Sequence, residues 1–250
     1  GVLADSAAVP PQNIYKTVAI NLKNLSEEEL FNEFIQGHHD ELRGMHSLLD
    51  LLKVGNELIA IEKLTVDFST TETNIKYYCF LTSSFLDLLT SLKGFLTAKT
   101  EWEIIYYSKY GFLTIYETVK TYHKYQKDFR AIVDNYHPHL KDEYAELNIV
   151  LKTFKKDYEY DTNISTLRNK AGGHFNEDFL VYYEQIENIN KEHSVKAITE
   201  FLNFLKSLMQ FIYKMAEETE KLTKESADKV EYEFFQKMKE LNDILKAEKN

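Results

Sequence analysis

Glycine and proline are scarce in this chain of 250 residues, which holds only 8 Gly and 3 Pro. Two of the prolines, Pro10 and Pro11, lie close to the N-terminus, and the third is Pro138. A β-rich fold needs many tight turns, and those turns depend largely on these two residue types. The scarcity therefore predicts an all-α protein, which we expect to be an antiparallel helical bundle with appended N- and C-terminal helices.

The chain shows no internal repeat and no low-complexity linker that would divide it into separate domains. Residues 1–14 lack hydrophobic periodicity, and we expect them to be a flexible lead-in. Residues 15–250 are expected to form a single all-helical domain, with a core over about 70–222 and a charged C-terminal helix over about 223–248. With 17 Tyr and 16 Phe, the chain can bury a large core.

Helix start signals and glycines predict the arrangement near the N-terminus. Ser26 and Glu29 have the spacing of a capping box, so a helix should begin there. Gly37 and Gly44 then separate this helix from a second one, which extends to about Gly55.

Hydrophobic residues at a spacing of three and four predict the later helices. One begins near Thr73, and a long one follows Lys99 as far as the turn at His137-Pro138-His139. The next helix begins at Pro138, a favourable first position, and extends to about Lys156. Residues 157–163 are expected to be a polar connection, and further amphipathic helices follow residue 173.

Charge and cysteine content limit the partners and the compartment. The net charge of -10 argues against broad nonspecific adhesion to nucleic acid or to an anionic membrane, although a small basic site is compatible with it. The single cysteine, Cys79, can form neither an intrachain disulfide nor a Cys-based zinc site, which suits a reducing cytoplasm. No apolar run approaches about 18 residues and no signal-peptide pattern is present, so we expect a cytoplasmic protein without a membrane partner.

One segment, residues 164–175, combines residue types that suit chemistry. Arg168 is followed by the polar Asn169, and His174 comes after the adjacent pair Gly172-Gly173. On an unbroken helix, positions six apart lie roughly 120° apart around the axis, so Arg168 and His174 would not share a face. The glycines permit positive φ and a break that turns His174 back towards Arg168. An arginine and a histidine brought together suit a phosphate.

The stretch Arg168-Asn169-Lys170-Ala171-Gly172-Gly173-His174 resembles the Arg-x(4–6)-His signature of the HEPN superfamily, including its polar residue after the arginine. HEPN proteins are helical bundles, and many are metal-independent endoribonucleases of toxin–antitoxin and other defence systems. The resemblance implies RNA as the partner, no metal, no cofactor, and a homodimer in which two motifs face one cleft. Some HEPN proteins also act with a protein partner or an antitoxin.

The resemblance also implies roles for individual residues. His174 acts as general base or acid on the RNA 2′-hydroxyl and the leaving 5′-oxygen. Arg168 binds the scissile phosphate and stabilises its transition-state charge. Asn169 orients the histidine or caps the following helix, and Lys170 contacts the substrate. The products would carry a 2′,3′-cyclic phosphate and a 5′-hydroxyl.

One position departs from part of the family. HEPN proteins controlled by a nucleotidyltransferase antitoxin usually carry a tyrosine two positions after the motif histidine. Here Phe175 and Asn176 follow His174, so regulation by tyrosine modification at that site is not expected.

A second function class is a noncatalytic helical module for protein–protein interaction or dimerisation through the charged C-terminal helix. In that case Arg168 pairs with a nearby carboxylate, such as Glu177 or Asp178, and His174 caps a helix.

Other groups of residues with metal-ligating or reactive side chains are expected to be structural. Di-iron bundles require a glutamate three positions before a histidine, and no histidine of this chain has one. The histidines and carboxylates near Gly44 are therefore expected to form a solvated helix junction. Cys79 is expected to be a buried thiol. The tyrosines of residues 106–125 are expected to pack in the core and at its rim instead of stacking on bases. The histidines and carboxylates near Gly44 are His38, His39, Asp40, Glu41 and His46. A second pair of histidines, His137 and His139, flanks the proline of the expected turn.

Overall fold

The computed structural model describes residues 27–62, 69–172, 179–187 and 189–247. Every element within these ranges is a helix, which confirms the expected all-α bundle. The chain divides into two compact units, residues 1–209 and 210–250. The lead-in expected at residues 1–14 and the N-cap expected at Ser26 lie outside the described residues.

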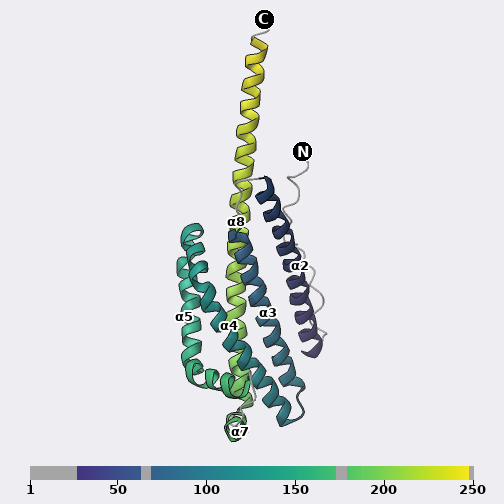
Figure 1. The fold of residues 1–250 in the computed structure, drawn as a ribbon, viewed down its shortest axis with the longest axis vertical. Coiled ribbons are helices and arrows are strands. Elements are labelled where there is room, and N and C mark those ends of the chain that lie inside the picture. Colours follow the sequence, from purple (N-terminus) through teal and green to yellow (C-terminus); the bar gives the residue numbers. More distant parts are fainter. Residues whose placement is uncertain (1–26, 63–68, 173–178, 188, 248–250) are drawn as a thin grey trace. The chain divides into compact units, whose positions relative to one another are not determined.

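The described residues form six longer helices and four short helical elements (Figure 1). The longer helices are α2 (Glu27–Glu62), α3 (Ser69–Thr97), α4 (Glu101–Tyr136), α5 (Lys141–Asp157), α7 (Phe179–Glu187) and α8 (Lys191–Ala247). The short elements are the 3₁₀ turn η2 (Pro138–Leu140), the π-helical turns η3 (Tyr160–Ile164) and η4 (Arg168–Gly172), and α6 (Ser165–Leu167) between those two turns.

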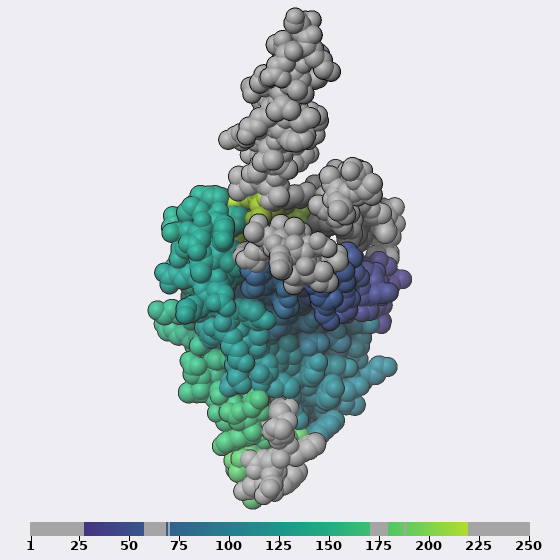
Figure 2. All heavy atoms as spheres, turned by 45° about the horizontal axis from the view of Figure 1, so that its top comes forward, coloured from purple at the N-terminus to yellow at the C-terminus, as the bar shows by residue number. Residues whose placement is uncertain are grey.

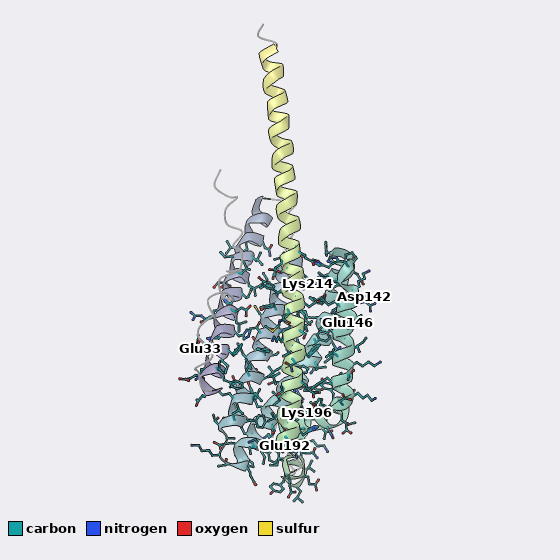
Figure 3. All side chains as sticks on the ribbon, turned by 180° about the vertical axis from the view of Figure 1, so that it is seen from behind. Glu33, Asp142, Glu146, Glu192, Lys196 and Lys214 are labelled. Carbon is teal, nitrogen blue, oxygen red and sulfur yellow. The ribbon has the colours of Figure 1, made fainter. Side chains whose placement is uncertain are left out.

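In the first unit, α3 packs between α2 and α4, and α5 lies beside α4 (Figure 1). Charged side chains lie on several outer faces. Figure 3 shows Glu33 on α2 and Asp142 and Glu146 on α5 at opposite margins, with Glu192 and Lys196 on α8 between them.

The N-terminal region is one helix of 36 residues, so the expected division at Gly37 and Gly44 is wrong. Both glycines lie within α2, and a Cβ at either position would meet nothing within 4 Å. The prediction of a solvated junction near Gly44 is also wrong for His38 and Glu41, because both side chains contact α3. The His38 ring packs edge-on to Phe85, with 4.9 Å between ring centroids.

The long helix α4 begins and ends at clear local signals. The hydroxyl oxygen of Thr100 accepts from the Glu103 amide, and the Glu103 side chain accepts from the Thr100 amide, which completes a capping box. The helix ends at Tyr136, and Pro138 opens the following turn, as expected. Gly94 on α3 allows a close approach to α4, because a Cβ there would clash with the ring of Tyr107.

Aromatic side chains dominate the core of the first unit. The Tyr77 ring lies 5.0 Å from that of Phe129 and 5.1 Å from that of Tyr125, and Phe154 lies 5.0 Å from Phe201 on α8. The tyrosines of α4 differ in burial. Tyr122 is buried, whereas Tyr106 is exposed.

The second unit is the C-terminal part of α8. The helix continues from the first unit to Ala247 without interruption, so the expected charged helix at about 223–248 is not a separate element.

By length and composition alone, the Thr71–Thr97 part of α3 is apolar enough to cross a membrane. In the structure its buried face forms part of the bundle core.

Candidate functional site

The segment that leads to Arg168 is a run of helical turns rather than the expected polar connection. Tyr158 and Tyr160 are both buried, and from Tyr160 the turns η3, α6 and η4 follow one another to Gly172. Glu159 adopts a positive φ of 46° between α5 and η3, the single such non-glycine residue in the described part of the chain. This left-handed residue ends α5 and redirects the chain, so that η4 packs on α4.

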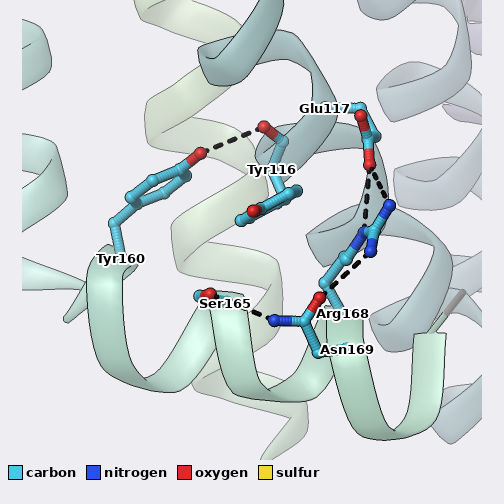
Figure 4. A network of polar contacts seen from close by, with 6 residues as sticks. All are labelled: Tyr116, Glu117, Tyr160, Ser165, Arg168 and Asn169. Carbon is cyan, nitrogen blue, oxygen red and sulfur yellow. Dashed lines mark hydrogen bonds and ion pairs between the residues drawn. The ribbon is translucent and has the colours of Figure 1, made fainter.

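Arg168 is anchored to α4 by two charge-assisted hydrogen bonds (Figure 4). Its Nε and Nη2 donate to Oε1 of Glu117 at 3.0 Å and 2.8 Å. The arginine side chain is 28% exposed and the glutamate side chain 41%. The pair thus lies at the surface, where solvent screens the attraction and its main effect is to fix the guanidinium in place.

Aromatic rings support the same guanidinium from one side. The Arg168 Cζ lies 5.3 Å from the centroid of the Tyr116 ring, which stacks on Tyr160 at 5.6 Å. The Tyr160 hydroxyl donates to the Tyr116 carbonyl oxygen at 3.1 Å, and Lys155 Nζ lies 4.7 Å from the Tyr160 ring centroid. Burial raises the pKa of Tyr160 well above its usual range, so this hydroxyl stays protonated at neutral pH.

Asn169 and Lys170, which the motif also includes, differ in their contacts. The Asn169 Oδ1 accepts from Arg168 Nη1 at 3.0 Å, and its Nδ2 lies 3.5 Å from Ser165 Oγ. Asn169 therefore orients the arginine. Its expected contact with the histidine involves a residue outside the described range. Lys170 is exposed on η4, where its ammonium group is accessible from solvent.

His174 and Gly173 lie outside the described residues, as do Phe175, Glu177 and Asp178. Gly172 is described and continues the π-helical turn without a positive φ. The expected break is therefore not at Gly172.

The charges around Arg168 are balanced. Arg168 pairs with Glu117, and Lys155 Nζ lies 3.6 Å from Asp161 Oδ1.

The guanidinium of Arg168 has five N–H donors. Three of them are used by Glu117 and Asn169, so two remain without a partner in the described part of the chain. These two donors can bind one further anionic oxygen group.

The other side chains that the sequence offered as metal ligands or reactive groups contact neighbouring residues or are partly buried. Glu41 receives hydrogen bonds from Tyr78 at 2.6 Å and from His38 at 3.1 Å. Within the described ranges, no three His, Cys, Asp or Glu side chains are arranged to hold a metal ion. His137 is buried. Cys79 is half-buried instead of fully buried, and burial raises the pKa of its thiol.

Sequence reasoning missed the partners that hold Arg168. Glu117 is 51 residues away along the chain, and Tyr116 and Tyr160 come from two different elements. The expected pairing of Arg168 with a carboxylate is present, and its described partner is Glu117. The carboxylates expected from the sequence, Glu177 and Asp178, lie outside the described residues.

No family model, curated protein or solved structure matches this chain.

Proposed function

We propose that the chain is a HEPN-like RNA-binding protein of a defence or toxin system that cleaves RNA without a metal, with Arg168 and His174 as the central pair. The observation that supports this proposal is the held guanidinium. Glu117, Asn169 and the Tyr116 ring fix Arg168 at the surface, and two of its N–H groups remain for a ligand. Such a group suits a phosphate diester.

In the proposed reaction, the 2′-oxygen attacks the adjacent phosphorus and the 5′-oxygen leaves. His174 takes the proton from the 2′-hydroxyl or supplies one to the leaving oxygen, and solvent or a second copy's histidine completes the transfer. Arg168 stabilises the charge that builds on the phosphate oxygens. The products are a 2′,3′-cyclic phosphate and a 5′-hydroxyl, and neither metal nor cofactor takes part.

The proposed assembly is a homodimer in which two motifs share one cleft. RNA is the proposed partner, and the cytoplasm is the proposed compartment. An antitoxin or another protein partner that covers Arg168 would inhibit the site.

A cleavage assay with three variants tests this proposal. Wild-type protein, Arg168→Ala, His174→Ala and the control His139→Ala are incubated with tRNA-rich RNA in EDTA. We expect cleavage by wild type and the control, with losses of at least a hundredfold in the other two. Equal cleavage by all four proteins, or cleavage by none, would overturn the nuclease proposal.

One observation favours the second candidate, a noncatalytic interaction module. The Glu117 carboxylate neutralises Arg168, which is the arrangement expected of a purely structural arginine. In that case Arg168→Ala lowers the free energy of unfolding without changing RNA binding, and gel filtration with multi-angle light scattering shows an assembly that RNA does not alter.

A further inference from the structure

A hollow of about 390 Å³ lies between α4 and α5 of the first unit, the two helices whose residues Figure 2 colours in teal. Three lysines line it from α5, namely Lys152, Lys155 and Lys156, and Asp161 of η3 contributes the one carboxylate. Lys155 lies 3.6 Å from that carboxylate. The other two lysines form no ion pair with any carboxylate of the described ranges, so the hollow has a local excess of positive charge in a chain of net charge -10.

A chain of hydrogen bonds connects this hollow to the core. The buried Tyr122 donates its hydroxyl to Asn148 Oδ1 at 2.7 Å, and Asn148 Nδ2 donates to the Tyr144 carbonyl oxygen at 2.7 Å. Asn148 Oδ1 also accepts from Gln126 Nε2 at 2.8 Å. A carbonyl oxygen can only accept, so these contacts fix the orientation of both side-chain amides.

The fixed amides determine which nitrogen of His123 carries its proton. Gln126 Oε1 lies 3.1 Å from His123 Nδ1 and can only accept, so Nδ1 donates. The Nε2 atom is then left for a ligand, as an acceptor in neutral imidazole and as a donor in imidazolium. His123 and Gln126 both line the hollow. The core therefore presents one imidazole to the hollow in a defined tautomer.

We infer that this hollow is a phosphate-binding site, in which Lys152 and Lys156 supply positive charge and His123 Nε2 supplies an oriented hydrogen bond. Lysine ammonium groups are common phosphate ligands. In an imidazolium both ring nitrogens donate, so Nε2 of His123 can donate to a phosphate oxygen while Nδ1 keeps its bond to Gln126. The volume lies within the range of pockets that hold small ligands, so a nucleotide phosphate fits as well as inorganic phosphate. The inference is independent of the proposed nuclease activity, because it uses neither Arg168 nor His174.

Isothermal titration calorimetry of the full chain, in phosphate-free buffer at constant ionic strength, tests the site. The probes are inorganic phosphate, AMP and a single-stranded RNA octamer. We expect the double variant Lys152→Gln/Lys156→Gln to weaken binding at least tenfold. The control Lys196→Gln/Lys206→Gln, which removes the same charge from exposed positions on α8, should change affinity less than twofold.

A second measurement tests the role of His123. Long-range ¹H–¹⁵N spectra should show Nε2 as the ring nitrogen that shifts when phosphate or AMP is added. Gln126→Leu should disturb the Nδ1 signal and weaken binding severalfold, while circular dichroism shows a folded protein.

The outcomes separate the sources of the phosphate. Binding of all three probes identifies a site for a free phosphate group, and binding of the octamer alone identifies an RNA backbone site, provided that the lysine double variant loses it. No binding of any probe, or equal losses in the double variant and its control, would overturn the inference. Whether or not the hollow binds phosphate, we still expect wild type to cleave RNA and His174→Ala to lose that cleavage, so the two proposals can fail separately.

Discussion

Arg168 and Glu117 are 51 residues apart in sequence and are joined by two hydrogen bonds to one oxygen. Nε and Nη2 of Arg168 donate to Oε1 of Glu117 at 3.0 Å and 2.8 Å. The carboxylate fixes the guanidinium and at the same time opposes any phosphate that approaches it. We therefore predict that Glu117→Gln strengthens RNA binding severalfold, because the amide oxygen still accepts while the negative charge is gone. Fluorescence anisotropy with labelled RNA measures the effect.

The same substitution should change stability little, by less than about 1 kcal/mol, because the pair is partly exposed. Glu146→Gln on the exposed face of α5 removes the same charge and should leave RNA binding unchanged. Weaker RNA binding by Glu117→Gln would contradict the idea that the carboxylate restrains Arg168.

The close packing of α3 on α4 predicts opposite effects for two Gly→Ala substitutions. Gly94→Ala should destabilise the protein by about 1–3 kcal/mol, because the new methyl group clashes with the Tyr107 ring. Gly37→Ala should stabilise it by up to about 1 kcal/mol, since that helix position has open space around it. Urea unfolding followed by circular dichroism distinguishes the two, and equal effects would argue against the contact.

Two buried tyrosines differ in whether their hydroxyl groups form a hydrogen bond. The Tyr77 hydroxyl has no hydrogen-bond partner among the described residues, whereas that of Tyr122 donates to Asn148 at 2.7 Å. Tyr77→Phe should therefore raise the free energy of unfolding by about 1 kcal/mol, and Tyr122→Phe should lower it by a similar amount. A stabilising Tyr122→Phe would show that the network from the core to the hollow contributes nothing to stability.

The start of α4 predicts a pH dependence of stability. The Glu103 carboxylate accepts from the Lys99 amide, from the Thr100 amide and from the Thr100 hydroxyl, and these bonds lower its pKa below the ordinary value of 4.5. A carboxyl whose pKa falls on folding stabilises the protein above its unfolded pKa. That contribution is lost as the pH falls through the folded pKa.

Glu103→Ala should therefore destabilise the protein at neutral pH, and the difference from wild type should shrink as the pH falls below 4.5. Denaturant midpoints at a series of pH values measure this difference. Glu101→Ala removes a neighbouring carboxylate of the same helical turn and should show a smaller effect. A difference that is independent of pH would mean that the charge of Glu103 does not contribute.

The scarcity of glycine and proline predicted the all-α fold, and hydrophobic spacing located its later helices, because one apolar face per helix is a local property of the sequence. The spacing correctly placed the end of α4 before Pro138. Gly37 and Gly44 were misinterpreted as helix boundaries, since packing of α2 on α3 outweighs the low helix propensity of glycine. Tyr158 and Tyr160 were assigned to a polar connection because of their acidic neighbours, although both rings are buried.

The candidate site was predictable only in part. The local run from Arg168 to Asn169 identified two residues that do contact each other. Glu117, Tyr116 and Tyr160 approach Arg168 only through the packing of η3 and η4 on α4, and no spacing in the sequence records that packing. The hollow was missed for a similar reason, because His123 and its lysines lie on different helices.

The end groups of the RNA products test the central proposal most directly. Wild-type protein and His174→Ala are incubated in EDTA with a single RNA, and with DNA of the same sequence. We predict that wild type cuts the RNA alone, leaving 2′,3′-cyclic phosphate and 5′-hydroxyl ends, and that His174→Ala leaves it intact. Products with a 5′-phosphate, cleavage of the DNA, or equal cleavage by His174→Ala would contradict it.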